Sequence, residues 1–274
     1  MQALPLVLSL LVAVVLTPLL RRRLVEAGMQ RENYRGVPLP VPIGVVIVPA
    51  ALVALIPIAL LARLTSADVF PADLSLVIAF APGVALLGLV DDVLSGESRG
   101  WRGHARAALS GGFSSGLLKA TGTLGLALLV ASALPGSDSE FLLASAVLVL
   151  ATNAFNLLDL RPGRSVKALV VLGVVLTAST QLIDPLWALG IFIGPVLVAG
   201  FFDLREKAML GDTGSNVIGA LAGVWLVLTL TPSEQVIALV VLVLINLFGE
   251  FRSISKLIEK LPGLRHLDSL GRPS

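Results

Sequence analysis

Long apolar runs separated by short polar stretches dominate this sequence, and they limit the folds that the chain can adopt. Most runs approach the length at which a helix crosses the hydrocarbon core of a bilayer, roughly 18 residues. The 274 residues are 56% hydrophobic and 14% charged, a balance that leaves a water-soluble domain without enough polar surface. We therefore expect an all-α, polytopic membrane bundle of about nine transmembrane helices. The runs are Leu4–Leu20, Val41–Ala62, Leu74–Val90, Thr121–Leu134, Phe141–Leu157, Ala168–Leu182, Leu186–Phe202, Asn216–Leu230 and Val236–Phe248.

The distribution of basic residues predicts how these helices are oriented. If the first helix runs from outside to inside, Arg63 is the only one of the 20 Lys and Arg residues that falls outside, as the positive-inside rule favours. The inner side then includes Arg99, Arg102 and Arg106 of the long loop after the third run. We expect a multi-pass protein of the inner (plasma) membrane, with its N-terminus outside and its C-terminus cytoplasmic. The first run lacks preceding basic residues, so we interpret it as an anchor rather than a signal peptide.

Composition also excludes several classes of site and partner. The chain has no cysteine and two histidines, which excludes thiolate zinc sites and disfavours a histidine-based metal site. A formal net charge of +2 gives no reason to expect nucleic acid as a partner. We expect one transmembrane domain over 1–249, followed by a cytoplasmic amphipathic tail over 250–274. That tail has apolar residues at near-helical spacing, as in helices that lie along a membrane interface.

Acidic and amide side chains gather at the predicted cytoplasmic ends of three runs. Acidic groups at membrane depth are costly to bury and are usually functional. These side chains form three motifs that end the third run, end the fifth and open the eighth. The residues are Asp91 and Asp92; Asn153, Asn156 and Asp159; and Asp212.

These motifs have the chemistry of a phosphoryl-transfer site. Neighbouring carboxylates can accept a proton or bind a hard cation such as Mg²⁺, which keeps coordination positions for substrate phosphates. Gly211–Ser215 opens a helix, where free N–H groups favour phosphate. Inner basic residues could neutralise a diphosphate; they are Lys119, Arg161, Arg164 and Lys207.

Each motif also has a structural alternative. Asp91 and Asp92 could form a solvated turn, and Asn153 and Asn156 could be interhelical hydrogen-bond partners. Asp212 could be a helix cap. The basic residues, taken singly, are typical topology determinants. The agreement of three motifs at one depth is what favours function.

The three motifs resemble those of the polyprenyl-phosphate N-acetylhexosamine-1-phosphate transferases (glycosyltransferase family 4). This superfamily includes the phospho-MurNAc-pentapeptide translocase and the GlcNAc-1-phosphate transferases. Gly88-Leu-Val-Asp91-Asp92, Asn153-Ala-Phe-Asn156-Leu-Leu-Asp159 and Leu210-Gly211-Asp212-Thr213-Gly214-Ser215 occur in the family's order. The loop ending at Lys119 is similar to its phosphate-binding loop. The resemblance implies transfer of a sugar 1-phosphate from a nucleotide sugar, UDP-HexNAc, to a polyprenyl phosphate at the cytoplasmic face. UMP would be released, and the product would serve cell envelope biogenesis.

The resemblance also implies residue roles. Asp91 and Asp92 serve the attacking lipid phosphate, one as its base, while Asp212 and Asn156 bind Mg²⁺, with Mn²⁺ as a substitute. Dimers are common in the family, so a homodimer is one oligomeric state that the resemblance implies. The remaining candidates would bind substrate, Lys119 through the diphosphate; they are Lys119, Asn153, Asp159, Arg161, Arg164, Lys207, Gly211, Thr213 and Ser215.

Some positions depart from the family pattern. Pro162 stands where relatives have an acid or Asn for the nucleobase, Met209 stands in place of Phe, and Asp203 stands near an expected Asn. The histidine-rich loop of many relatives is not recognisable. We therefore expect a divergent member, with a non-catalytic membrane scaffold or lipid-phosphate binder as the alternative. A transporter is a weaker third hypothesis, since no span is visibly broken at its middle.

Overall fold

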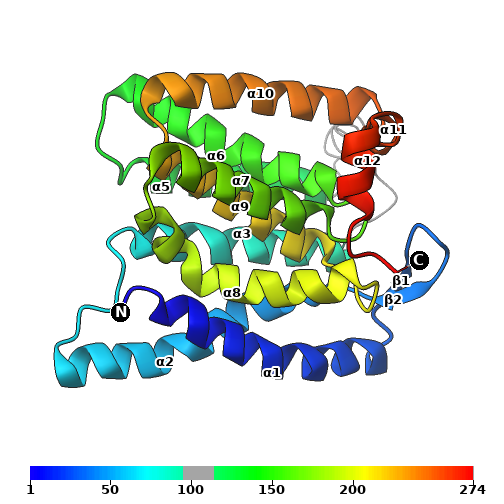
Figure 1. The fold of residues 1–274 in the computed structure, drawn as a ribbon, viewed down its shortest axis with the longest axis horizontal. Helices are drawn as coiled ribbons and strands as arrows, with labels where there is room; N and C mark the ends of the chain where they lie inside the picture. The colour runs from blue at the N-terminus through cyan, green and yellow to red at the C-terminus, as the bar shows by residue number, and fades with distance from the viewer. Residues whose placement is uncertain (95–113, 274) are drawn as a thin grey trace.

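Each apolar run of the sequence is helical for most of its length in the computed structural model, which describes residues 1–94 and 114–273. The expected inner-loop residues Arg99, Arg102 and Arg106 lie outside the described residues. The long helices run side by side in one bundle (Figure 1). They are α1 (Leu4–Glu26), α2 (Ile47–Thr65), α3 (Leu74–Leu94), α5 (Ser115–Ala131), α6 (Asp138–Leu158), α7 (Arg164–Thr180), α8 (Asp184–Leu204), α9 (Gly211–Thr229) and α10 (Pro232–Phe251).

Short elements lie between and after the long helices. Two short strands pair antiparallel, with Arg31 opposite Leu39, and form a hairpin between α1 and α2. A 3-10 turn, η1, leads directly into α2. These elements are β1 (Gln30–Glu32), β2 (Pro38–Pro40), η1 (Ile43–Val46), α11 (Ile254–Lys260) and α12 (Pro262–Ser269).

The described residues contain six helices that are long and apolar enough to cross a membrane, which supports an all-α, multi-pass membrane protein. These six include α1, α3 and α6, and the span that joins η1 to α2. Helices α5 and α7 have 17 residues each, slightly less than a full crossing needs. Helix α9 opens with the polar Gly211–Asn216 segment. The length and polarity of these three helices explain why they fall short of an apolar span.

Helix α9 is at the centre of the bundle. It packs against α3, α6, α7, α8 and η1, and it is buried along nearly its whole length. Helix α10 is at the rim, because only Gln235 and Leu242 of its side chains are buried. Its exposed Val and Leu side chains suit contact with lipid tails, while its backbone groups are satisfied within the helix.

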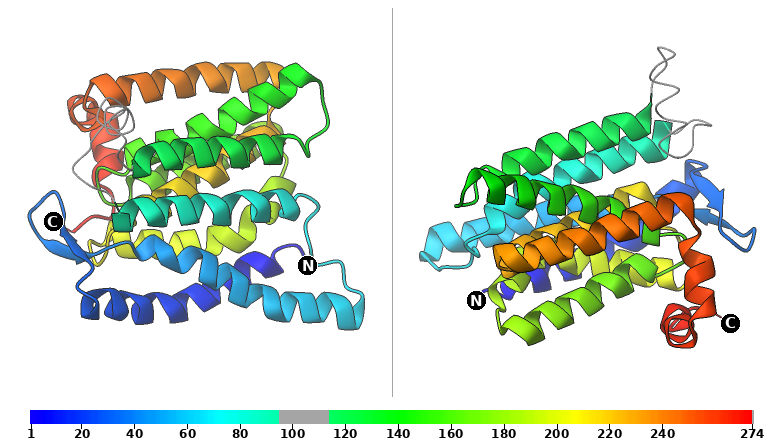
Figure 2. Two further views of the ribbon diagram at one scale, coloured as in Figure 1. Left: turned by 180° about the vertical axis from the view of Figure 1, so that it is seen from behind. Right: turned by 90° about the horizontal axis from the view of Figure 1, so that it is seen from above.

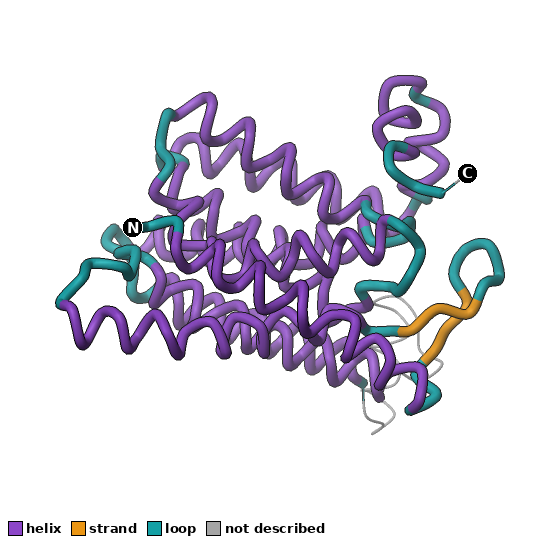
Figure 3. The backbone as a smooth tube through the Cα atoms, turned by 60° about the horizontal axis from the view of Figure 1, so that its bottom comes forward, coloured by secondary structure: helices purple, strands orange, loops and turns teal. Residues whose placement is uncertain are grey.

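The two ends of the bundle differ. The hairpin, α11, α12 and the C-terminus lie at one end, and the N-terminus lies at the other (Figures 1 and 3). We call the first of these the hairpin end. Helix α1 ends there with Arg21, Arg22 and Arg23, whereas α2 starts there and carries Arg63 in its last turn, at the opposite end. The helical connectivity thus separates these basic residues in the way that the sequence predicts.

Candidate functional site

Charged side chains from α3, α5 and α9 meet at the hairpin end. The Nζ atom of Lys119 donates a hydrogen bond to Oδ2 of Asp91 at 2.6 Å and pairs also with Oδ2 of Asp212. The Asp91 and Lys119 side chains are 12% and 17% exposed, and that of Asp212 is 34% exposed. We call these residues the Asp91–Lys119–Asp212 cluster. Two carboxylates therefore converge on one cation at a place that remains open to solvent on the Asp212 side.

Asp92 has a different role from Asp91, although the two are adjacent. Its carboxylate accepts hydrogen bonds from the backbone N–H groups of Asp212 at 3.0 Å and Thr213 at 2.8 Å, and from the Thr213 hydroxyl at 2.7 Å. Successive side chains on a helix point about 100° apart, so Asp91 reaches α5 while Asp92 reaches α9. The buried Asp92 carboxylate thus caps α9 from a neighbouring helix and satisfies donors that lack intrahelical partners.

This capping corrects one expectation from the sequence. The first turn of α9 was expected to offer free N–H groups to a phosphate, but Asp92 occupies those of Asp212 and Thr213. The Thr213 hydroxyl, expected to bind substrate, also donates to Asp92. Both oxygens of Asp92 are therefore engaged by protein donors. Its contacts indicate a positioning residue that holds Asp212 in place, and they leave Asp91 as the carboxylate of the two that faces Lys119.

Two motif glycines make the close approach of α3 and α9 possible. A Cβ atom at Gly88 would lie 2.5 Å from the carbonyl oxygen of Asp212, well inside van der Waals contact. Gly211 has a φ of +71°, and a Cβ there would lie 2.8 Å from Oδ2 of Asp92. Any side chain at Gly211 would be strained and would also crowd the cap. Gly211 was expected to bind substrate, and its structural demands explain the residue without that role.

Asn156 and Ser215 pair beside the cluster rather than within it. The Ser215 hydroxyl lies 2.8 Å from Oδ1 of Asn156 and 3.0 Å from the carbonyl oxygen of Gly211. The amide oxygen that was expected to bind the metal is therefore an acceptor for Ser215. This bond joins the last turn of α6 to the N-terminal part of α9.

The number and kind of side-chain oxygen atoms decide whether Mg²⁺ fits this site. Among residues 1–94 and 114–273, no group of three His, Cys, Asp or Glu side chains gathers in a way that could hold a metal ion. Mg²⁺ is commonly held by only one or two carboxylates, with waters and substrate phosphates completing its shell. Asp91 and Asp212 already share a cationic partner in Lys119. This pair of carboxylates fits Mg²⁺ in kind, as a site completed by substrate.

Asp159 and Asp203 support the loops next to the cluster. Oδ1 of Asp159 accepts a hydrogen bond from the Ser165 hydroxyl at 3.2 Å. Burial, with repulsion from Asp203, raises the pKa of Asp159 well above its ordinary value. The Asp203 carboxylate accepts from the N–H of Gly163 at 2.6 Å and of Leu210 at 3.2 Å. Asp203 thus ties the loop after α6 to the residue before Gly211, a role that its sequence motif did not reveal.

Three expected substrate-binding residues make contacts away from the cluster. Arg161 donates to Glu259 at 3.1 Å and lies over the Tyr34 ring, 4.3 Å from its centroid. The Nζ atom of Lys207 lies 5.7 Å from the Phe201 ring centroid. Asn153 donates to Asn246 of α10 at 2.5 Å. Asn153 is therefore an interhelical hydrogen-bond partner, which was the alternative to substrate binding for this residue.

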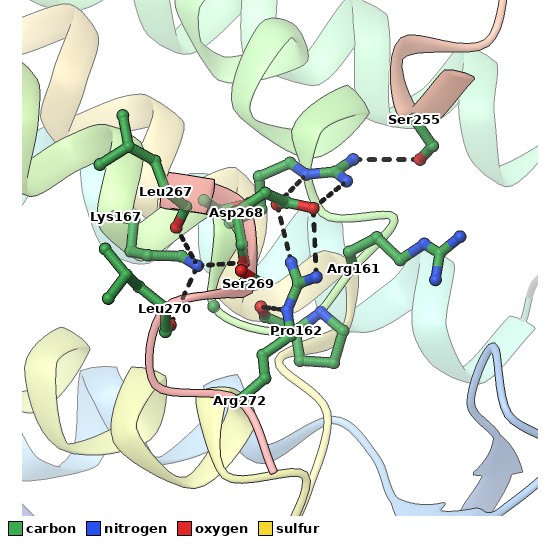
Figure 4. A network of polar contacts seen from close by, with 12 residues as sticks. Arg161, Pro162, Lys167, Ser255, Leu267, Asp268, Ser269, Leu270 and Arg272 are labelled. Atoms are coloured by element: carbon green, nitrogen blue, oxygen red, sulfur yellow. Dashed lines mark hydrogen bonds and ion pairs between the residues drawn. The ribbon is translucent and has the colours of Figure 1, made fainter. Parts of the chain in front are cut away.

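Arg164, a fourth expected substrate-binding residue, is held by tail residues, among them Ser255 and Asp268, which are labelled in Figure 4. Its guanidinium makes two hydrogen bonds to Asp268, at 2.9 and 3.0 Å, and one to Ser255 at 3.1 Å. Arg272 also pairs with Asp268 and donates to the carbonyl oxygen of Pro162 at 2.8 Å. Arg164 is thus committed to a structural network, and the assignment of this residue to substrate has no support in its contacts.

Asp268 is a residue that the sequence reasoning missed. Burial would raise its pKa, but the hydrogen bonds from Arg164 and Arg272 outweigh burial and lower the pKa to about 2. The one available signal was its spacing of four residues from Arg272, the spacing of ion pairs on a helix, although α12 ends at Ser269, before Arg272. Its main partner, Arg164, lies 104 residues away in the sequence, so no local pattern could have identified it.

Met209 and Pro162, two positions where the sequence differs from the pattern that it resembles, have structural contacts. The backbone N–H of Met209 donates to the Pro40 carbonyl at 2.9 Å, and the Met209 carbonyl accepts from Ile43 at 2.8 Å. Pro162 accepts from Arg272 through its carbonyl oxygen. Both residues therefore contribute backbone groups that hold the hairpin and the tail against the bundle end.

The chain matches no family model and, at a significant level, no curated protein. The functional assignment therefore depends on the motifs and on the geometry described above.

Proposed function

We propose that this protein is a Mg²⁺-dependent phosphoglycosyl transferase of the plasma membrane. It would transfer a sugar 1-phosphate from a nucleotide sugar, UDP-HexNAc in the first instance, to a polyprenyl phosphate, with release of UMP. The observation that carries the proposal is the convergence of Asp91, Lys119 and Asp212 from three helices at one end of a membrane bundle. Carboxylates for a divalent cation and an ammonium for a diphosphate are the parts that phosphoryl transfer needs.

The reaction assigns a task to each member of the cluster. An oxygen of the lipid phosphate attacks the sugar-bearing phosphorus of the nucleotide sugar, and a new P–O bond forms. The bond from that phosphorus to the bridging oxygen breaks, and its electron pair leaves with UMP. A phosphate monoester loses its second proton at a pH of about 6, so at neutral pH the lipid phosphate is already largely a dianion and attacks without giving a proton to the cluster. Lys119 stabilises the negative charge that develops on the diphosphate oxygens.

Asp91 and Asp212 are the residues that would hold Mg²⁺. The bound ion would neutralise diphosphate oxygens as a Lewis acid. Asp212 is fixed for this purpose because Asp92 binds its backbone N–H and that of Thr213. Asn156 supports the start of α9 instead, because its amide oxygen accepts a hydrogen bond from the Ser215 hydroxyl.

We further propose nine transmembrane helices, with the hairpin end in the cytoplasm. The charge separation between Arg21–Arg23 and Arg63 supports this orientation, since basic residues favour the inner side. It also brings the cluster to the face where a soluble nucleotide sugar and a membrane-held lipid phosphate can meet. The count of nine includes α9, whose buried position within the bundle allows a less apolar composition, and it includes α5 and α7, which have 17 residues each.

Transfer of labelled sugar phosphate to polyprenyl phosphate, by purified protein with Mg²⁺, tests the proposal. Asp91→Asn and Asp212→Asn are each expected to lower turnover by about 10²–10³-fold, the range for lost electrostatic stabilisation. Asp68→Asn is the matched control, because Asp68 is an exposed acid in the loop between α2 and α3. Undiminished turnover in both cluster variants would refute the proposal. A screen of nucleotide sugars for thermal stabilisation with Mg²⁺ would identify the donor.

A non-catalytic lipid-phosphate binder is the second candidate. The observation that favours it is that Lys119 is already paired with both acids, while Arg161 and Arg164 are paired with tail residues. Such a protein would bind polyprenyl phosphate saturably and would show no transfer with any nucleotide sugar. Transfer that depends on Asp91 would exclude this candidate.

A further inference from the structure

The two tail helices run across the hairpin end of the bundle rather than along it (Figures 1 and 2). Helix α11 begins directly after α10, the helix at the rim, and α12 follows at once. Asp268 anchors α12 to Arg164, the first residue of α7. Lys167 adds to this anchor, because its Nζ donates to the carbonyl oxygens of Leu267 and Asp268 at 2.9 and 2.5 Å (Figure 4). The anchor fixes which face of α12 is turned toward the bundle.

Exposed leucines lie beside that face. Residues three and four apart lie on one side of a helix, so Leu264 is on the same side of α12 as both Asp268 and Leu267, while Leu267 points about 100° away from its neighbour Asp268. Asp268 faces α7, yet Leu264 is 44% exposed and Leu267 is 52% exposed. The described residues of the bundle therefore leave about half of each leucine uncovered, on the flank of α12 next to its anchored face. In a membrane-spanning bundle, the region beside its end is occupied by the bilayer surface.

The tail also carries basic side chains suited to an anionic surface. Glu259 is paired with Arg161, and Asp268 is paired with Arg164 and Arg272, so the tail's acids at these positions are neutralised within the protein. Four further basic residues are exposed on or beside α11 and α12: Arg252, Lys256, Lys260 and Arg265. Leucines on one face and basic residues around them are the pattern of helices that lie on negatively charged bilayers.

We propose that α11 and α12 dock on the anionic headgroups of the same bilayer that holds the bundle, with Asp268–Arg164 as the internal anchor. Leu264 and Leu267 enter the headgroup region, while Lys256, Lys260 and Arg265 bind lipid phosphates. His266 lies on the opposite side of α12 from Leu264, since two residues correspond to about 200° of helix rotation. This docking does not depend on the proposed transferase activity.

The absence of cysteine from the chain allows a site-specific test on the full-length protein. Leu264→Cys and His266→Cys are each labelled with an environment-sensitive dye and placed in nanodiscs. One set contains phosphatidylcholine alone, and the other contains phosphatidylcholine with phosphatidylglycerol. Quenching by a lipid-attached quencher reports whether each probe enters the bilayer. We expect quenching at position 264 in the anionic discs, less quenching there in neutral discs, and little at position 266 in either.

A charge-reduced variant gives a second measurement. Lys256→Gln, Lys260→Gln and Arg265→Gln together, in the Leu264→Cys background, should abolish the difference between the two lipid compositions. Each basic residue near an anionic surface contributes about fivefold to the equilibrium constant for docking. Equal quenching at positions 264 and 266, or equal quenching at 264 in neutral and anionic discs, would overturn the proposal. Unchanged thermal stability of each variant serves as the folding control.

Discussion

Replacement of Asp92 tests the division of labour between the two adjacent acids. The Asp92 carboxylate accepts three hydrogen bonds, from two backbone N–H groups and one hydroxyl, over 2.7 to 3.0 Å. Its side chain is buried, with 7% of the residue exposed. Each buried donor left without an acceptor costs about 1–3 kcal/mol. With three such donors, we expect Asp92→Ala to lower the free energy of unfolding by about 3–9 kcal/mol, a large fraction of the stability of a typical domain.

Asp92→Asn should have a smaller effect, because the amide keeps one acceptor oxygen but loses the charge. We expect a loss of about 2–3 kcal/mol. The Asp91→Asn variant is the matched comparison: it removes one ion pair with Lys119, which still pairs with Asp212. The Asp91–Lys119 pair is largely buried, but Lys119 keeps Asp212 as a charged partner and the new amide keeps one acceptor oxygen, so the free energy of unfolding should fall by about 1–2 kcal/mol, while the proposed activity is lost. The two neighbouring substitutions thus differ in the main property that they affect: stability for Asp92 and activity for Asp91.

Unfolding in mixed micelles measures these free energies, and amide hydrogen exchange localises them. In Asp92→Asn, the N–H groups of Asp212 and Thr213 should exchange faster than in the parent protein, while the interior of α9 should change less. A double-mutant cycle with Thr213→Val should show coupling, since the Thr213 hydroxyl donates directly to Asp92. An Asp92→Asn variant with parental stability and unchanged exchange at these two amides would refute the cap.

Three further predictions follow from the same contacts. Lys119→Met removes the cation shared by the cluster, so transfer should fall by about 10²–10³-fold with parental protein as reference; unaltered turnover would count against its role. Gly88→Ala places a Cβ atom 2.5 Å from the Asp212 carbonyl and should destabilise the protein by about 1–3 kcal/mol, measured by unfolding; parental stability would show that α3 can move freely. The lowered pKa of Asp268, about 2 against an ordinary 3.8, means that its stabilisation is present above pH 3.8 and is lost as pH falls through about 2, when the carboxylate that binds Arg164 is protonated. Hydrogen exchange of α12 across this range should show its release, and protection that persists below pH 2 would contradict the anchor.

The helices were predictable from the sequence because burial in lipid demands long apolar runs, and each run is largely helical in the structure. The separation of Arg63 from Arg21–Arg23 also agrees with the pattern of charge along the chain. The convergence of Asp91 and Asp212 was expected from motifs at one depth and from family resemblance. Lys119 was expected beside them for the same reason.

The orientation of individual side chains could not be predicted in this way. Whether Asp91 or Asp92 faces α9 depends on the rotation of α3, since one residue changes the direction by about 100°. The partners of Arg164 were hidden because Asp268 lies far away in the sequence. In sequence alone, an Arg near a membrane surface could determine topology, bind substrate or form an internal ion pair. For Arg164, the packing of the tail selects the ion pair.

Metal binding in the presence of substrate tests the central claim most directly. Mn²⁺ is titrated into the detergent-purified protein, with and without UDP-N-acetylglucosamine, and free Mn²⁺ is followed by electron paramagnetic resonance. We predict one Mn²⁺ per chain that binds more tightly with the nucleotide sugar, is displaced by Mg²⁺, and is lost in both Asp91→Asn and Asp212→Asn. Binding that survives in both variants, or no binding by the parent protein with or without the nucleotide sugar, would contradict a shared metal site.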